Sequence, residues 1–289
     1  MKIIGTGLSG FVGSRITELL LDTYQFEDIS RKTGTDILDK EAVFKRIERS
    51  DASVVLHLVA YVDVDSAEED KDKKEKSIAW EINVNGTRNV LEACEKFNKK
   101  IIYISTDMVF PGTKKFPEKY KEEDKRDPVG WYAKTKGEAE KIIEKTFIPW
   151  MILRIAYPYR AEHEKKEYVR VFKWLLEKGQ KVEAVSDHYF TPTFVDDLAP
   201  ALKTLINRDE TGKFHIAGDE AVSPYTAAIK VAEIFNLNKN LITKTSSEEF
   251  FKGRVPRACN LSLNNDKITK LGVEMHSFTE ALGIIKKQI

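Results

Sequence analysis

Cysteine is scarce in this sequence, and neither sign of charge is in excess. The 289 residues include only two cysteines, Cys94 and Cys259, without metal-ligand spacing, so we expect no disulfide framework. Lysine and arginine number 47 against 46 acidic residues, a net charge of +1. This balance provides no electrostatic surface for nucleic acid or for membranes, so a partner has to be sought at a specific site.

Long apolar runs are also missing. No stretch approaches the length of a membrane span, and Met1 leads directly into an apolar segment with no room for a signal peptide, so we expect a cytoplasmic protein. The sequence contains no low-complexity linker and no internal repeat, so a second lobe should be interleaved with the first. No carboxylate cluster predicts a metal ion.

The most informative stretch is KIIGTGLSGFVG at residues 2–13. A strand-like segment runs into three glycines spaced three apart, and an amphipathic segment over 11–21 follows, which predicts a strand, a glycine turn and a helix. A dinucleotide pyrophosphate lies against backbone N–H groups at such a helix N-terminus, where a Cβ would hold the phosphates away. Gly5 and Gly7 can take the positive φ of a sharp turn. The cofactor-binding residues expected here are Gly7, Ser9, Gly10, Phe11 and Val12.

A second strand is predicted at residues 24–30, and the residues that follow it indicate the type of cofactor. An acidic residue here would bind both ribose hydroxyls, whereas Arg31 and Lys32 favour a 2′-phosphate. NADPH is therefore mildly preferred over NADH, although a solvated basic turn is an equally good interpretation of this pair. Asp36 and Ile37 follow and could flank an adenine edge.

Strand and helix patterns alternate over the first 155 residues, which predicts a parallel, doubly wound α/β sheet of the Rossmann type. Further strands are expected at 53–58, 100–105, 150–155, 181–184 and 213–216, and helices at 40–49, 78–97, 132–146, 166–178, 198–206, 224–235 and 278–287. Residues 68–76 indicate a solvated loop or helix start, and 111–128 a long loop able to cover a substrate. We expect a dinucleotide-binding domain over 1–160, to which the chain returns around 187–217, and a smaller, interleaved C-terminal substrate lobe over 161–289.

The ends of two predicted strands should form one wall of the cofactor site, because ligands bind outside the carboxyl ends of parallel strands. The first ends near His57, which is better interpreted as a satisfied wall histidine than as a ligand, and is followed by cofactor-binding candidates Leu58, Val59 and Ala60. The other ends in Ser105-Thr106-Asp107.

A possible catalytic group follows the long loop. Tyr132 and Lys136 lie four residues apart on a predicted helix and can face the same ligand. A tyrosine hydroxyl has an ordinary pKa near 10, so it transfers protons poorly at neutral pH unless an ammonium stabilises its anion. With Thr106 binding the same substrate oxygen, the three residues form a site for hydride transfer to a carbonyl, in which Tyr132 is the general acid and Lys136 also holds the nicotinamide ribose.

These motifs resemble the extended short-chain dehydrogenase/reductase superfamily: TGLSGFVG at Thr6–Gly13, the strand end at Ser105-Thr106, and Tyr132 with Lys136. Several others resemble the dTDP-4-dehydrorhamnose reductase family within it. They are TDILD at 35–39, AYVDVDSAE at 60–68, STDMVFPG at 105–112, LRIAYPYR at 153–160, the TPT link at 191–193 and VPRACNLSL at 255–263.

The resemblance implies NAD(P)H-dependent reduction of a 4-keto group on a nucleotide-linked deoxysugar. It also implies the substrate-binding candidates Asp107, Val109, Phe110, Tyr157 and Arg257, the last for the sugar-nucleotide diphosphate. Three segments depart from the family pattern: His57-Leu58-Val59, the charged insertion at 69–76 and His188-Tyr189-Phe190. The sugar and the nucleotide base therefore stay open.

Two other functions are compatible with these motifs. A nucleotide-sugar epimerase or dehydratase would retain NAD and consume no cofactor. A non-catalytic NADP-binding regulatory subunit, similar to the methionine adenosyltransferase beta subunit, would bind the cofactor without turnover. The expected partner is a small nucleotide-sugar, with neither nucleic acid nor membrane, and a homodimer is possible.

Overall fold

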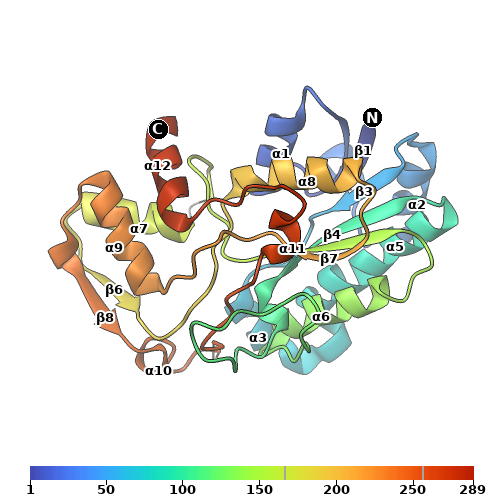
Figure 1. Ribbon diagram of the computed structural model, residues 1–289. Helices are drawn as coiled ribbons and strands as arrows, with labels where there is room; N and C mark the ends of the chain where they lie inside the picture. The colour runs from blue at the N-terminus through green and yellow to red at the C-terminus, as the bar shows by residue number, and fades with distance from the viewer. Residues whose placement is uncertain (166, 256) are drawn as a thin grey trace.

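A six-stranded parallel sheet forms the centre of the structure, a computed structural model that describes residues 1–165, 167–255 and 257–289 (Figure 1). The strand order is β2-β1-β3-β4-β5-β7, and every neighbouring pair is parallel. The strands are β1 (Lys2–Thr6), β2 (Gln25–Ile29), β3 (Val54–His57), β4 (Lys100–Thr106), β5 (Trp150–Ile155) and β7 (Gly212–His215). The order reverses between β1 and β3, which confirms the predicted doubly wound fold.

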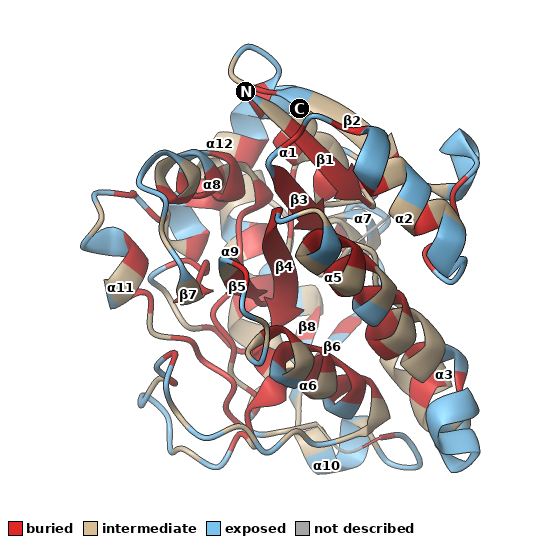
Figure 2. Cartoon of the chain, turned by 90° about the vertical axis from the view of Figure 1, so that its right-hand side faces the viewer, coloured by how far each residue is buried: buried red, intermediate tan, exposed pale blue. Residues whose placement is uncertain are grey.

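Helices cover both faces of this sheet, because successive residues of a strand point to opposite sides. Ile3 packs against one face with α1 (Gly13–Leu20) and α8 (Leu198–Asn207), while Ile4 packs against the other with α2 (Lys40–Arg49), α5 (Thr87–Lys96) and α6 (Trp131–Ile143). The inner strands are therefore buried on both sides, as the burial colours of β1, β3 and β4 show (Figure 2).

The helix expected at 78–97 is not continuous. It consists of α4 (Ile78–Trp80), a π-helix η3 (Glu81–Gly86) and α5. The side chain of Asn83 exchanges hydrogen bonds with the backbone of Tyr61, which ties η3 to the loop after β3. A Cβ on Gly86 would lie 2.5 Å from Ile37 Cδ1, so the π-helix also approaches the segment after β2 closely. The sequence 68–76 joins the end of α3 (Val64–Glu69) to the 3₁₀ turn η2 (Lys71–Lys76).

A smaller α/β group follows β5 and surrounds a two-stranded parallel sheet of β6 (Val182–Val185) and β8 (Ile242–Thr245). Its helices are α7 (Tyr168–Glu177), α9 (Pro224–Phe235) and α12 (Phe278–Gln288), which meet in an aromatic core around Tyr159, Phe190 and Phe194. Two short helices, α10 (Ser247–Phe250) and α11 (Asp266–Thr269), lie between β8 and α12. The expected start of the α7 helix at Lys166 lies outside the described residues. The domain division at residue 160 stays a prediction.

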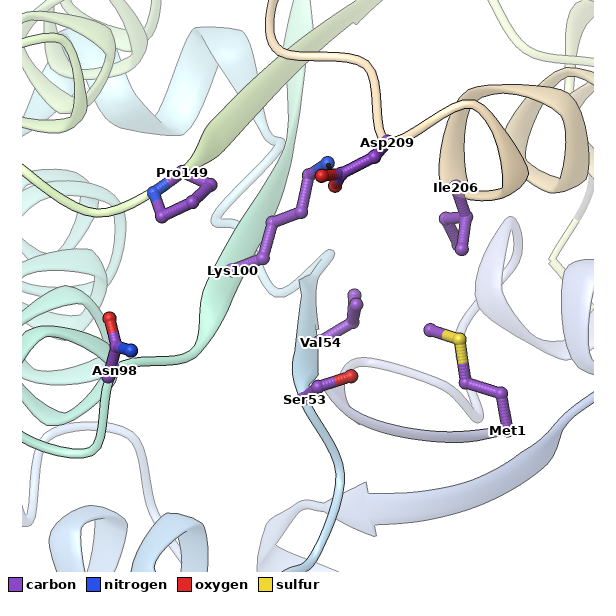
Figure 3. Close-up of a pocket in the computed structure, with 8 residues that line it drawn as sticks. All are labelled: Met1, Ser53, Val54, Asn98, Lys100, Pro149, Ile206 and Asp209. Atoms are coloured by element: carbon purple, nitrogen blue, oxygen red, sulfur yellow. Dashed lines mark hydrogen bonds and ion pairs between the residues drawn. The ribbon is translucent and has the colours of Figure 1, made fainter.

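A pocket of about 290 Å³ lies at the amino ends of β3, β4 and β5 (Figure 3). Its lining includes Lys100, which is nearly buried and pairs with Asp209 at 2.7 Å. This is the edge of the sheet opposite Thr106, so the pocket contains none of the expected site residues. Within the described ranges, no helix is long and apolar enough to span a membrane.

Candidate active site

The glycine turn joins β1 to α1 at the carboxyl edge of the sheet. Gly7 has φ +70°, and its carbonyl oxygen accepts a hydrogen bond of 3.0 Å from the Gly10 N–H. A Cβ on Gly7 would lie 3.0 Å from the Val59 nitrogen, so the turn packs directly on the loop after β3. The helix begins at Gly13 instead of Phe11, and Ser9 and Gly10 are exposed while Phe11 and Val12 are half-buried.

Gly5 differs from the expectation. Its φ is not positive, and glycine is needed there for close packing, because a Cβ would lie 2.8 Å from the Leu56 carbonyl oxygen. The adjacent Thr6 hydroxyl accepts hydrogen bonds of 3.3 Å from the backbone N–H groups of both Leu58 and Val59. The half-buried segment from Leu58 to Ala60 is therefore fastened to the glycine turn.

Arg31, Asp36 and Ile37 lie after β2. The Arg31 side chain is 74% exposed, and its Nε donates to Asp36 Oδ2 at 2.8 Å. The Leu38 backbone N–H and this guanidinium together hold the pKa of Asp36 below its ordinary value. Ile37 is buried against Gly86. The segment after β2 therefore provides both an apolar side chain, Ile37, and an exposed cation, Arg31.

Thr106, Tyr132 and Lys136 come together beyond the end of β4. Helix α6 places Tyr132 and Lys136 one turn apart, and all three side chains are more than nine-tenths buried. The Lys136 ammonium donates a hydrogen bond of 2.8 Å to the Ile104 carbonyl oxygen and lies 4.1 Å from the centre of the Tyr103 ring. The Thr106 hydroxyl donates to Asp107 Oδ1 at 2.9 Å.

The start of α6 depends on a residue from another helix. Its N-cap, Gly130, has no side chain to accept a hydrogen bond from the first turn and adopts φ +85°. Glu68, on α3, accepts a hydrogen bond of 2.7 Å from the Trp131 backbone N–H. A carboxylate at a helix N-terminus also interacts favourably with the helix dipole. Glu68 thus fixes the backbone directly before Tyr132.

Burial dominates the ionisation of this group. It lowers the pKa of Lys136 to about 7, with the Glu140 carboxylate acting against the shift, and it raises the pKa of Asp107 to about 7, opposed by hydrogen bonds from the Thr106 side chain and backbone N–H groups. Burial and the nearby Asp107 carboxylate raise the pKa of Tyr132, while the Thr106 hydroxyl acts in the opposite direction. Such perturbed pKa values are common at functional sites.

Three of the substrate-binding candidates lie near Thr106, Tyr132 and Lys136 or beside the smaller α/β group. Asp107 is 2% exposed, and its Oδ2 has no hydrogen-bond partner among the described residues. Tyr157 adopts a strained φ of +40°, and its ring stacks on Phe190 with centroids 3.8 Å apart. Arg257 forms an ion pair of 2.7 Å with Asp65 on α3.

Val109 and Phe110, two further substrate-binding candidates, lie deeper in the structure. Both side chains are fully buried, and Phe110 is stacked on Tyr120 with ring centroids 4.4 Å apart while the Arg154 guanidinium lies over its ring. Both residues belong to a core cluster, and their expected role in substrate binding stays a prediction. The half-buried Met108 between them and Asp107 packs near Tyr132 instead.

Several residues of the site were not predicted from the sequence. Glu68 lies 63 positions before the helix that it caps, and Asn83 hydrogen-bonds Thr135 on α6 across 52 positions. His188 accepts a hydrogen bond of 2.9 Å from the Tyr157 hydroxyl, because its Nδ1 donates to the Ala258 carbonyl oxygen. The one signal in the sequence was the departure of His188 from the family pattern.

Known proteins are similar to this chain in both sequence and fold. The dTDP-4-dehydrorhamnose reductase of Mycobacterium tuberculosis is 30% identical over 254 residues, which cover 86% of this chain and 80% of that protein. Methionine adenosyltransferase 2 subunit beta of Rattus norvegicus is 30% identical over 247 residues, 82% of this chain and 70% of that protein. A crystal structure of dTDP-4-dehydrorhamnose reductase from Bacillus anthracis in complex with NADP superposes with a TM-score of 0.90 at 26% identity, covering 100% of this chain and 99% of that one.

The comparison also covers the whole sequence, since the family model described as RmlD substrate binding domain matches residues 1–289. One family therefore accounts for the motifs in both the first and the last third of the sequence, as the resemblance predicted. The chain belongs to the RmlD substrate binding domain family.

Proposed function

We propose that this protein is an NADPH-dependent reductase that acts on the 4-keto group of a nucleotide-linked deoxysugar, like the dTDP-4-dehydrorhamnose reductases to which it is similar. The observation that carries the proposal is the group of Thr106, Tyr132 and Lys136 beyond the carboxyl end of β4, the edge at which the glycine turn also lies. A proton donor, a second hydroxyl and a cation are the groups that carbonyl reduction requires.

The residues present fit a nicotinamide dinucleotide. The backbone of the glycine turn is open on the side of Ser9 and Gly10, and Gly7 takes a conformation that L side chains rarely adopt. Phe11 and Val12 would hold the pyrophosphate together with the glycine turn. Leu58, Val59 and Ala60 would line the other side of the cofactor, and Ile37 would provide an apolar surface for the adenine. Arg31, exposed beside Asp36, is suited to a 2′-phosphate, which supports NADPH over NADH. When bound, the reduced nicotinamide supplies the hydride.

The chain's own residues supply the proton and the charge. We assign to Thr106 and Tyr132 the two hydrogen bonds that hold the keto oxygen, with Tyr132 giving up its proton as charge develops on that oxygen. Lys136 uses one of its three N–H groups on the Ile104 carbonyl, so two stay available for the ribose and for the tyrosinate. Because burial and the Asp107 carboxylate raise the pKa of Tyr132, the lysine charge is needed to make this hydroxyl an effective acid.

The sugar-nucleotide is assigned to the side of the site that faces the smaller α/β group. Asp107 presents an unpaired carboxyl oxygen, Tyr157 an aromatic face and Arg257 a guanidinium for the diphosphate. Residues 161–289 would then supply much of the substrate lobe. A homodimer and a cytoplasmic location stay predictions, for which light scattering and cell fractionation are the measurements.

The test mixes the protein with NADPH or NADH and a panel of dTDP- and UDP-linked 4-keto-6-deoxysugars while absorbance at 340 nm is followed. We expect NADPH to be consumed with at least one sugar, and Tyr132→Phe to lower kcat by about 10²- to 10⁴-fold, the contribution of a positioned acid. Tyr225→Phe, on α9, is the matched control and should keep wild-type activity. Turnover that persists in Tyr132→Phe would contradict the mechanism.

The same assay separates the alternatives. An epimerase or dehydratase would copurify with NAD and convert the sugar without a change at 340 nm. A regulatory subunit, favoured by the similarity to methionine adenosyltransferase 2 subunit beta, would bind NADPH with no turnover on the whole panel and would retain a protein partner in pull-down.

A further inference from the structure

A row of buried polar side chains crosses the sheet one level below the proposed cofactor site. In the parallel register Thr6 of β1 pairs with His57 of β3, and His57 pairs with Tyr103 of β4. Their side chains share the face of the sheet that α5 and α6 cover, and none is more than 1% exposed. The row therefore begins at the glycine turn and ends beneath Lys136.

The hydrogen bonds of His57 define which of its ring nitrogens carries the proton. Thr87 on α5 donates its hydroxyl proton to the Asn83 carbonyl oxygen at 2.7 Å, so it accepts from His57 Nε2 at 2.9 Å. The other ring nitrogen, Nδ1, then accepts from the Thr6 hydroxyl at 2.6 Å. Burial, together with the charge of Lys136, lowers the pKa of His57 to about 3, so the ring is neutral throughout the working range.

Tyr103 connects this row to the lysine. Its ring stacks against His57, with centroids 5.6 Å apart and planes 30° apart, and the Lys136 ammonium lies 4.1 Å from the ring centre. The Tyr103 hydroxyl is buried, and the Thr87 hydroxyl lies close enough to oppose the rise in its pKa that burial causes. The aromatic face, and not the hydroxyl, is what Tyr103 presents to Lys136. A cation over an aromatic ring is attracted most strongly when both are removed from water, as here.

We propose that Tyr103 is a positioning residue for Lys136 and that neutral His57 holds the Tyr103 ring in place. The row Thr6–His57–Tyr103 then ties the ammonium to the glycine turn on which the cofactor sits. The role of Lys136 in catalysis comes from the proposed function, but the placement of its ammonium does not. Lysine has a flexible four-carbon stem, so a second contact besides the Ile104 carbonyl is needed to keep one geometry.

Other ionisable groups also surround Lys136. Glu140 and Tyr132 share its helix, and Asp107 lies next to Tyr132. Glu140 is neutralised by Arg154 of β5, whose Nη2 donates to it at 2.7 Å, and by Arg126. These groups are unchanged in variants of Tyr103, so such variants isolate the contribution of the ring.

The test compares Tyr103→Leu, which removes the aromatic face, with Tyr103→Phe, which keeps it. In Tyr103→Leu we expect kcat to fall roughly tenfold with little change in KM for the keto-sugar, and the basic limb of the kcat profile to move about one pH unit lower. Tyr103→Phe should stay within about twofold of wild type, because it keeps the ring face on which the ammonium lies. Tyr24→Leu, at a buried tyrosine on the other face, is the control for a general loss of packing and should leave the limb in place.

A second measurement does not depend on turnover. In protein with ¹⁵N- and ¹³C-labelled lysine, the Lys136 side-chain signal is the one missing from Lys136→Met, and its pH titration can be followed by NMR. The titration should move about one pH unit lower in Tyr103→Leu and stay unchanged in Tyr103→Phe. His57→Leu should move it in the same direction by less, and an unmoved titration would remove His57 from the proposal.

The outcomes distinguish the two proposals. If no sugar is reduced but the lysine titration moves in Tyr103→Leu, the proposed function fails and the placement of Lys136 stands. If reduction is observed but Tyr103→Leu leaves both the titration and the basic limb where they are in wild type, the role of Tyr103 is overturned.

Discussion

Asp107 and Lys136 are two buried residues whose ordinary charges are both disfavoured by their surroundings. Burial brings the pKa of each to about 7, from opposite sides. Near neutral pH, the site can therefore pass from a neutral carboxyl with an ammonium to a carboxylate with an amine. The first combination suits carbonyl reduction, because it places positive charge and a hydrogen-bond donor where negative charge develops.

The carboxyl of Asp107 should make its own contribution to the pH dependence. Below pH 7 it is neutral, and above pH 7 it is a carboxylate that raises the pKa of Tyr132 further. We expect kcat/KM of the wild type to fall above pH 7 with a slope approaching two protons, since Lys136 also loses a proton there. In Asp107→Asn the slope should approach one. The measurement is kcat/KM from pH 5.5 to 9.5.

An exposed carboxylate serves as the control for Asp107→Asn. Asp72 lies in η2, far along the sequence from the catalytic group, and Asp72→Asn should retain the wild-type profile. A profile of Asp107→Asn that coincides with that of wild type would show that this carboxyl does not ionise in the working range.

Helix α6 is the element on which the catalytic geometry depends, and other elements fasten it at several points. Glu68 caps its N-terminus, Asn83 bonds Thr135 in its first turns, and Glu140 forms a bidentate pair with Arg154 on β5. A buried pair of this kind is costly to break by removing one partner, because the other charge is left unpaired. The helix therefore has little freedom to shift Tyr132 or Lys136.

Removing the cap should affect both stability and catalysis. Glu68→Ala leaves the Trp131 N–H without its acceptor, and we expect the free energy of unfolding to fall by about 1 kcal/mol, the usual effect of a lost cap. The value of kcat should fall with it, because Tyr132 directly follows the capped residue. Urea unfolding and the reductase assay measure the two effects.

The neighbouring Glu69 gives a matched comparison on the same helix. It is exposed, so Glu69→Ala should change the free energy of unfolding by less than about 0.5 kcal/mol. Equal effects of the two substitutions would mean that the hydrogen bond to Trp131 contributes nothing specific.

The elements also show what sequence patterns can and cannot predict. Strand β5 and helix α9 have the predicted bounds, because a continuous apolar run and a helical period with Pro224 at its start are local signals. Strand β8 was missed, since ITKT is short and half exposed. The π-helix η3 was missed because it depends on contacts of Asn83 and Gly86 with distant segments.

The same distinction holds within the site. The glycine turn and the Tyr132–Lys136 pair were predicted because each depends on spacing within one segment. Whether Phe110 faces a substrate or the core depends on Tyr120 and Arg154, which no local pattern connects to it. For the same reason the cap from Glu68 and the bond from Tyr157 to His188 became evident only in three dimensions.

For the molecule as a whole, the burial of Lys136 should reduce stability. The pKa of Lys136 is lowered from 10.5 to about 7 in the folded protein, so the unfolded chain binds more protons between these values. Folding stability attributable to this residue therefore rises as pH increases from 7 to 10.5, and below pH 7 the penalty is complete. The Ile104 carbonyl and the Tyr103 ring offset part of this cost in the folded state. Such a loss of stability is common where activity and stability compete.

Lys136→Met should accordingly stabilise the protein at low pH while abolishing reduction. The whole shift corresponds to roughly 5 kcal/mol, and we expect about 2 kcal/mol at pH 6, because methionine also loses the bond to Ile104 and the contact with Tyr103. The gain should vanish near about pH 8.5 and become a loss of about 2 kcal/mol at pH 10, where the lysine is neutral in the folded protein and its penalty is largely gone. Urea unfolding of both proteins at pH 6, 8 and 10 measures it, with the exposed Lys141→Met as control on the same helix. A variant less stable than wild type at pH 6, or a gain independent of pH, would show that the Lys136 ammonium is fully compensated where it lies.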